Sequence, residues 1–243
     1  MTTYQFTEET DLPWKPIQKP AEIAEARLIS AILEGYFPIN SHLPGERELA
    51  ESLGVTRPTL REVLQRLARD GWLDIQHGKP TRICDYWKEG RLGVLNALSE
   101  HPDQLPENFI PDLLNVRLAM APMYTAAAVS NQPGKIIKIL EKRHNLGNSP
   151  HNFAQFDWHL QHQMTILGGN PVFVLILNGF KDLFQKLAPY YFSNLAARQH
   201  SMKYYEMLAR AAQNNKISEA RHLTIDVMRE SLVFWKQTDF LSD

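Results

Sequence analysis

The sequence predicts a mainly α-helical protein in two parts: a small N-terminal domain that includes a β-hairpin, and a C-terminal all-α bundle of six or seven helices. Apolar residues recur at three- and four-residue spacing over most of the chain, which is typical of helices that pack on one face. Only residues 73–76 and 81–84 alternate between apolar and polar positions, as short strands do. A length of 243 residues suits two small domains or one large one.

The composition excludes several classes of protein. Hydrophobic residues make up 44% of the chain, enough for a packed core. The longest purely apolar run, Val172–Leu177, is far shorter than the roughly 20 residues that cross a bilayer. Residues 1–14 lack the pattern of an export signal, and the single cysteine, Cys84, excludes a disulfide framework and a Cys-rich zinc site. We therefore expect a cytoplasmic protein with no membrane partner.

The N-terminal domain is expected over residues 21–84, after a flexible tail at residues 1–20 that contains three prolines. Apolar residues at helical spacing predict a first helix over residues 21–34. A short second helix, Glu46–Ser52, is expected to end in a tight turn on Gly54.

A third helix follows directly and has one apolar and one polar face. Thr56 suits its N-cap, and Pro58 suits its first turn, where the missing N–H costs nothing. The apolar stripe consists of Leu60, Val63, Leu64, Leu67 and Ala68. The opposite face carries Arg57, Thr59, Arg61, Gln65 and Arg69. If the apolar stripe packs inward, the basic face is left free for the major groove of DNA.

A hairpin completes this domain, with strands at Leu73–Gln76 and Thr81–Cys84 and a tip at residues 77–80. The order helix, helix, turn, helix, hairpin is that of a winged helix-turn-helix domain. The whole chain has a formal net charge of −1. Residues 57–82, however, hold six basic and three acidic side chains, so positive charge is concentrated in this stretch.

The C-terminal domain is expected over residues 106–240, after a linker at residues 85–105 that includes a short helix. From Pro106 onward only helical periodicity is found. The expected helices are Phe109–Ser130, Gly134–His144, Asn152–Leu167, Pro171–Ala188, Leu195–Asn214 and Ile217–Gln237.

Two stretches of the N-terminal domain, GVTRPTLREVLQRLARDGWL and IQHGKPT, resemble the DNA-binding domain of the GntR family of bacterial regulators, and most closely its fatty-acid-responsive members. The likeness continues more loosely in GNPVFVLILNGFKDLF, in YYFSNLAAR and in the final ES…W. It thus covers about residues 21 to 237. What the resemblance implies is a homodimeric transcription regulator, not an enzyme, that binds a palindromic operator and releases it when the C-terminal domain binds long-chain fatty acyl-CoA. Such a regulator represses fatty acid degradation and activates unsaturated fatty acid synthesis.

The resemblance also implies DNA contacts, which fall on Arg47, Thr56, Arg57, Thr59, Arg61, His77 and Gly78. An arginine fork matches guanine O6 and N7 or two phosphate oxygens, and hydroxyls at a helix start suit phosphates. A glycine keeps the hairpin tip slim enough for a minor groove. Pro58 departs from these relatives, which carry a hydroxyl there, so any contact made by that hydroxyl is absent.

Many GntR regulators of this architecture bind a metal through one Asp and three His inside the helical bundle. The GGNP motif sets the register, and Asp157 matches the family's Asp. The three histidine positions fall on Gln161, Tyr205 and Val227, so one ligand of four remains. A divalent metal needs several converging donors. We therefore predict no metal and no cofactor there, with Asp157 as a buried hydrogen-bonding residue.

In place of the metal, the resemblance implies a pocket for an acyl chain, with tyrosine hydroxyls near the thioester and Arg117 near CoA phosphates. Met228 replaces a glycine of the relatives and narrows or shifts the seat of the ligand. By periodicity alone the aromatic residues would be ordinary bundle core. The predicted ligand-binding residues are Leu114, Arg117, Phe184, Tyr191, Tyr205, Val227, Met228, Ser231 and Trp235.

Two alternatives stay open at this point. One is a GntR-type regulator that senses another small metabolite, such as a carboxylate. The other is an acyl-CoA-binding protein whose winged helix makes protein contacts. An enzyme is not favoured, because the sequence has no Walker, GxGxxG, HExxH or GxSxG motif and no base can be named for Ser231 or Cys84.

Overall fold

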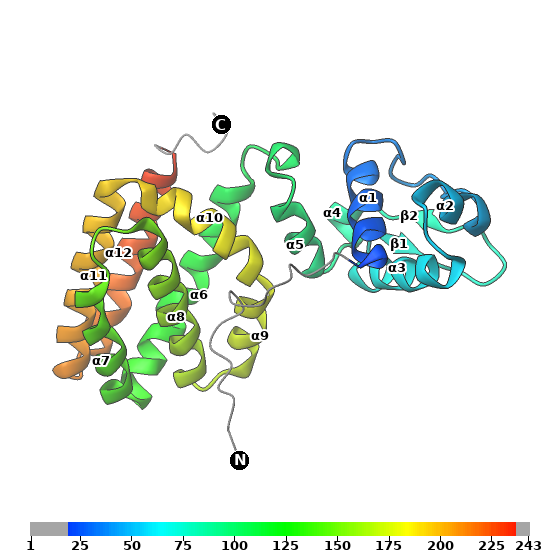
Figure 1. Cartoon of the computed structure of the whole chain (residues 1–243). Coiled ribbons are helices and arrows are strands. Elements are labelled where there is room, and N and C mark those ends of the chain that lie inside the picture. The colour runs from blue at the N-terminus through cyan, green and yellow to red at the C-terminus, as the bar shows by residue number, and fades with distance from the viewer. Residues whose placement is uncertain (1–18, 237–243) are drawn as a thin grey trace, which may run out of the picture. The chain divides into compact units, whose positions relative to one another are not determined.

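The computed structural model describes residues 19–236 and divides the chain into two compact units, with the division between Gly90 and Arg91 (Figure 1). The elements of the first unit are α1 (Pro20–Leu33), α2 (Glu46–Leu53), α3 (Arg57–Asp70), β1 (Leu73–Asp74), β2 (Arg82–Ile83) and α4 (Tyr86–Glu89). Those of the second are α5 (Gly93–Ser99), η1 (Pro102–Gln104), α6 (Phe109–Asn131), α7 (Pro133–Glu141), η2 (Lys142–Asn145), α8 (Pro150–Leu167), α9 (Pro171–Gly179), α10 (Lys181–Ser193), α11 (Leu195–Gln213) and α12 (Ile217–Trp235).

The core of the first unit forms where α1 and α2 pack on α3. The predicted stripe of α3 is buried at Leu60, Val63, Leu64 and Leu67. Gly54 ends α2 with a φ of +71°, a left-handed conformation that glycine adopts without steric cost. The chain therefore turns sharply between α2 and α3, and the predicted helix-turn-helix is confirmed.

The hairpin is shorter than the sequence predicts. Strands β1 and β2 are antiparallel, with Leu73 opposite Ile83 and Asp74 opposite Arg82. The second strand also uses its other edge, because Ile83 donates to the Ser41 carbonyl and the Thr81 carbonyl accepts from Leu43. Residues 75, 76, 81 and 84 fall outside the two strands, so the expected four-residue strands are corrected to two residues each.

The second unit has seven α-helices between Pro106 and Lys236, in agreement with the predicted bundle. Helix α6 packs against both α8 and α12, and α11 packs against α7 and α12 (Figure 1). The largest fully buried side chains of its core include Tyr124, Leu160, Met164 and Tyr205. No described helix is long and apolar enough to cross a membrane.

The helix expected over Pro171–Ala188 is instead two helices, α9 and α10, with Phe180 between them. A Cβ on Gly179 would lie 3.0 Å from Leu92 Cδ1, so the end of α9 packs closely against the segment that contains Leu92. The periodic pattern continues across the break, which is why the sequence suggests one helix. The helix expected over Gly134–His144 is α7, which ends at Glu141. The 3-10 helix η2 follows it directly.

The stretch expected as a linker contains two helices that belong to different units. Helix α4 lies in the first unit, and α5 lies in the second. The tail expected at residues 1–20 falls almost wholly outside the described residues, which begin at Lys19. Cys84 is buried beside β2 and unpaired.

Candidate DNA-binding face and ligand pocket

The N-terminus of α3 is held by its own threonines. The Thr56 hydroxyl accepts from the Thr59 backbone N–H at 3.3 Å and lies 2.8 Å from the Thr59 hydroxyl. This cap replaces a hydrogen bond that the first turn of a helix otherwise lacks. It starts α3 at Arg57 and leaves the side chains of Arg57 and Arg61 exposed one turn apart.

Both arginines converge on one carboxylate. Glu46, the first residue of α2, lies 2.8 Å from Arg61 Nε and 3.7 Å from Arg57 Nη2, in each case through its Oε2 atom. Arg47 beside it pairs with Glu51 one turn further along α2, at 3.2 Å. Sequence reasoning assigns no role to Glu46, because its partners are 11 and 15 residues away and meet it only through the turn at Gly54.

Other basic residues of the 57–82 stretch are engaged within the first unit. Arg66 pairs with Glu25 and Glu62, and these hydrogen bonds raise its pKa. Arg82 pairs with Asp74 and with Glu89. Arg66 therefore joins α3 to α1, and Arg82 joins the hairpin to α4. The side chains of Arg57 and Arg61 are more exposed, at 57% and 61%, although both lie near Glu46.

The Arg82–Glu89 pair joins strand β2 to α4. Both guanidinium nitrogens of Arg82 donate to the Glu89 carboxylate, at 3.1 and 2.8 Å. These bonds, with a backbone N–H from Asp85, lower the pKa of Glu89 to about 2.

The tip of the hairpin is a tight turn. The Lys79 N–H donates to the Gln76 carbonyl at 3.1 Å, and Gly78 at the third position has a φ of +74°. A glycine with positive φ at this position is typical of a type II turn. His77 and Gly78 are both exposed, and no atom lies within 4 Å of where a Cβ on Gly78 would be. The tip is therefore narrow and open, as insertion into a groove requires.

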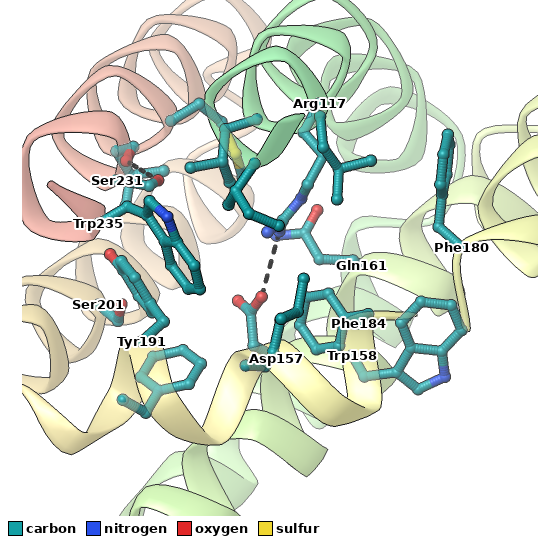
Figure 2. Close-up of a pocket in the computed structure, with 18 of the residues that line it drawn as sticks. Arg117, Asp157, Trp158, Gln161, Phe180, Phe184, Tyr191, Ser201, Ser231 and Trp235 are labelled. Atoms are coloured by element: carbon teal, nitrogen blue, oxygen red, sulfur yellow. Dashed lines mark hydrogen bonds and ion pairs between the residues drawn. The ribbon is translucent and has the colours of Figure 1, made fainter. Parts of the chain in front are cut away.

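A largely apolar pocket lies inside the helical unit, between α6, α8, α10, α11 and α12 (Figure 2). It holds about 830 Å³ of space free of atoms, a figure that includes solvent at its open mouth. Its apolar wall consists of Ile110, Leu113, Leu114, Trp158, Leu177, Phe180, Phe184, Leu187, Ala188, Phe192, Val227, Met228 and Trp235. Its polar residues are Arg117, Asp157, Gln161, Tyr191, Ser201, Tyr204 and Ser231.

An ion pair crosses this pocket. Arg117 Nη2 lies 3.3 Å from Asp157 Oδ2, and the two side chains are only 17% and 11% exposed (Figure 2). The guanidinium also lies over the ring of Phe184, 5.2 Å from its centre. Tyr205 donates its hydroxyl to Asp157 Oδ1 at 3.0 Å, which confirms Asp157 as a buried hydrogen-bonding residue. The charge of Arg117 is thus already balanced inside the pocket.

Gln161 leaves one donor unused in the pocket. Its side-chain oxygen accepts from the Tyr124 hydroxyl at 2.6 Å, while its amide nitrogen has no hydrogen-bond partner among the described residues. The residue is 1% exposed, so bulk water does not reach this N–H freely. Burial also raises the pKa of Tyr124, and it raises the pKa of Tyr191 to about 12. These phenols are therefore neutral donors at physiological pH.

Eight of the nine predicted ligand-binding residues line this one pocket, namely Leu114, Arg117, Phe184, Tyr191, Val227, Met228, Ser231 and Trp235. Tyr205 is the exception and a correction: it is fully buried behind the pocket, where its hydroxyl holds Asp157. Sequence reasoning did not identify Trp158 of α8, Ser201 of α11 or Phe180, which lies between α9 and α10. Only their shared helical faces, once the helix order in space is known, could have indicated them.

The residues that the resemblance aligns with metal ligands of other GntR regulators are bonded to other side chains or lack a donor atom. Asp157 is bonded to Arg117 and Tyr205, Gln161 is bonded to Tyr124, and Val227 has no donor atom. Within residues 19–236 no group of three or more His, Cys, Asp or Glu side chains could hold a metal ion.

Known proteins resemble the chain over most of its length. Residues 20–83 match the family described as bacterial regulatory proteins of the gntR family, and residues 84–240 match the FadR C-terminal domain. A fatty acid metabolism regulator protein of Shewanella pealeana is 43% identical over 218 residues, which cover 89% of this chain and 91% of that protein. One from Shewanella oneidensis is 45% identical over 198 residues, which cover 79% and 81%.

The fold has solved counterparts. The structure of Lar, which controls the expression of the Listeria monocytogenes agr system, has a TM-score of 0.59 at 15% sequence identity. The match covers 92% of this chain and 99% of Lar. Because only 15% of the residues are identical, the likeness concerns the fold alone. The chain belongs to the GntR family of bacterial transcription regulators, in the group that carries the FadR C-terminal domain.

Proposed function

We propose that this DNA-binding regulator of fatty acid metabolism acts as a homodimer and releases a palindromic operator when its helical unit binds long-chain fatty acyl-CoA. Release would relieve repression of fatty acid degradation and end activation of unsaturated fatty acid synthesis. The proposal places the effector in the pocket of Figure 2 and the operator on the face of α3 and the hairpin tip.

The observation that carries the effector assignment is the chemistry of the pocket. Its wall is largely apolar, which suits an alkyl chain, and the buried amide NH2 of Gln161 lacks an acceptor. A thioester carbonyl is an uncharged acceptor that this amide can bind. A free carboxylate suits the pocket less well, because the charge of Arg117 is already balanced by Asp157. These features favour a neutral acyl group over a carboxylate metabolite.

For the operator, Arg57 and Arg61 are assigned to base edges or phosphates, Thr56 and Thr59 to phosphates, and Arg47 to the backbone crossed by α2. His77 and Gly78 are assigned to the minor groove. The exposure of Arg47, Arg57, Arg61, His77 and Gly78 supports these roles. Since each α3 reads one half-site, a dimer reads a palindrome.

The test is an operator titration with a palindromic site selected from random DNA. We expect palmitoyl-CoA to lower operator affinity, while palmitate and CoA added separately do so weakly. Arg57→Ala is expected to cost roughly 1–3 kcal/mol of operator binding if Arg57 reads a guanine. Unchanged operator binding by Arg57→Ala would rule out the assigned face, and release by a carboxylate metabolite alone would rule out the assigned effector.

A further inference from the structure

Glu46 occupies a position on the DNA-reading face that no assigned role explains. One oxygen of its carboxylate lies 2.8 Å from Arg61 Nε and 3.7 Å from Arg57 Nη2. All three side chains are substantially exposed, at 38% for Glu46, 57% for Arg57 and 61% for Arg61. A carboxylate at this position weakens the attraction between the arginines and the phosphates of DNA, which is unexpected on a DNA-binding surface.

We infer that Glu46 is a specificity-determining residue, which holds both arginines in a base-reading arrangement and weakens their attraction for phosphate at wrong sequences. The inference rests on the proposed role of Arg57 and Arg61 in operator binding. Glu46 contacts both arginines, so its inferred role is to position the two side chains that are assigned to the bases.

The first part of the argument is geometric. Glu46 engages Arg61 through Nε, which leaves both terminal Nη groups of that guanidinium available. Those two groups form the fork that matches guanine O6 and N7. A long arginine side chain loses much rotamer freedom when it is fixed on a base. Because the carboxylate already restricts Arg61 in the free protein, less of that freedom remains to be lost on operator binding.

The second part is electrostatic. Two arginines alone would present two positive charges, whereas the trio with Glu46 carries one. Binding to non-specific DNA depends almost entirely on neutralised phosphates and released counterions. The carboxylate therefore weakens non-specific binding, while the ordered fork favours the matched base. Both effects increase the ratio of specific to non-specific affinity.

Glu46 also has a simpler possible role, since a carboxylate in the first turn of a helix stabilises the helix dipole. Glu48 provides the matched control, because it lies in the same first turn of α2, is exposed, and forms no ion pair with the described residues. Removing either charge changes net charge and helix dipole alike. Only Glu46→Gln removes the carboxylate that pairs with Arg57 and Arg61.

The experiment compares the wild-type chain, Glu46→Gln and Glu48→Gln on the selected operator and on a scrambled duplex over a range of salt. For Glu46→Gln we expect the slope of log affinity against log salt on scrambled DNA to steepen by about 0.9. We expect its ratio of specific to non-specific affinity to fall about two- to fivefold, as for the loss of an exposed ion pair. Glu48→Gln is expected to leave that ratio unchanged.

Equal ratios for Glu46→Gln and Glu48→Gln would overturn the inference, since Glu46 would then be one more surface charge. Arg61→Ala and Arg57→Ala separate this failure from failure of the proposed function. If they weaken operator binding while the Glu46→Gln ratio stays at wild type, only the role of Glu46 is wrong. If they bind operator normally, the assigned face itself is wrong, and the inference fails with it.

Discussion

The ion pair of Arg117 and Asp157 is an unusual feature for an apolar pocket, because taking two charges out of water costs free energy that their attraction only partly returns. Here the cost is reduced by further contacts on both sides. Tyr205 donates to Asp157, and the ring of Phe184 lies under the guanidinium. The pair is therefore stable as a unit, and each partner depends on the other.

This dependence can be measured. Arg117→Leu should lower the free energy of unfolding by about 3 kcal/mol, because it leaves a buried carboxylate with only the hydroxyl of Tyr205 as partner. The double variant Arg117→Leu/Asp157→Leu should regain much of that loss, since no unpaired charge remains. Urea unfolding of the two variants and the wild type measures these free energies of unfolding. A double variant less stable than Arg117→Leu would contradict the argument.

Gln161 permits a prediction about the ligand. Gln161→Leu removes the unpaired N–H of the pocket, so palmitoyl-CoA should bind more weakly by about 1 kcal/mol, roughly fivefold. Gln155→Leu, on the exposed side of the same helix, is the control and should bind as wild type does. Isothermal titration of both variants gives the comparison. Equal affinity for Gln161→Leu and wild type would mean that the thioester lies elsewhere.

At the scale of elements, the sequence predicts most where local and tertiary signals agree. Helix α3 has a capping threonine, a proline in its first turn and a full apolar stripe, and all of them are used as expected. The break between α9 and α10 was missed because apolar periodicity continues across it, and only the three-dimensional structure shows where one helix ends and the next begins. The clustering of Glu46 with Arg57 and Arg61 was missed because it is a tertiary contact, which periodicity cannot show.

The sequence indicates which residues line the pocket better than it indicates the hydrogen bonds among them. A family register places residues on the correct helices, and eight of nine indeed share one cavity. It does not show which way a side chain points from its helix. Tyr205, predicted to line the pocket, does not line it, and its hydroxyl donates to Asp157. The partner of each polar group depends on helix rotation and crossing angle, which a single sequence does not specify.

The attachment of β2 to α4 makes the stability of the first unit depend on pH. The pKa of Glu89 is lowered from 4.5 to about 2 by Arg82, so the pair stabilises the folded form fully above pH 4.5. That contribution is lost as the pH falls towards 2, where the carboxylate is protonated. Glu89→Gln should therefore lower the Tm at pH 7 and have little effect near pH 2.

A double-mutant comparison isolates this pair from other carboxylates. In an Arg82→Gln background, Glu89→Gln should produce a much smaller pH-dependent difference in Tm, because the guanidinium is absent and the backbone N–H of Asp85 is the main group that still lowers the pKa of Glu89. Thermal unfolding between pH 2 and 7 provides the measurement. A pH-dependent difference that persists undiminished in this background would assign the effect to another partner of Glu89.

At the scale of the whole molecule, the assembly state follows from the way DNA is read. One α3 contacts one half-site, and a small winged domain gives limited affinity alone. We therefore expect a dimer of about 56 kDa, twice the 28.0 kDa of the chain. Sedimentation at micromolar concentration measures this directly, and a 28 kDa species under those conditions would contradict the proposed dimer.

The final prediction concerns communication between the two units. Acyl-CoA can weaken operator binding only if it binds more tightly to a conformation that holds DNA poorly, and by linkage the operator must weaken acyl-CoA binding by the same factor. We expect helix α12 to transmit ligand binding to the first unit, because Val227, Met228, Ser231 and Trp235 all line the pocket. Figure 2 shows two of them, Ser231 and Trp235.

Trp235→Ala should therefore raise the palmitoyl-CoA concentration needed for operator release, while operator affinity without ligand stays close to wild type. Ser231→Asn should act in the same direction, because Ser231 is buried with its hydroxyl bonded to the Val227 carbonyl, and a larger side chain must enter the cavity. Operator titrations at increasing palmitoyl-CoA give the release midpoints, and isothermal titration with and without operator gives the reciprocal factor. If both variants release DNA at wild-type concentrations, α12 does not sense the effector. If the two coupling factors differ, a third linked equilibrium, such as dimer dissociation, takes part in the switch.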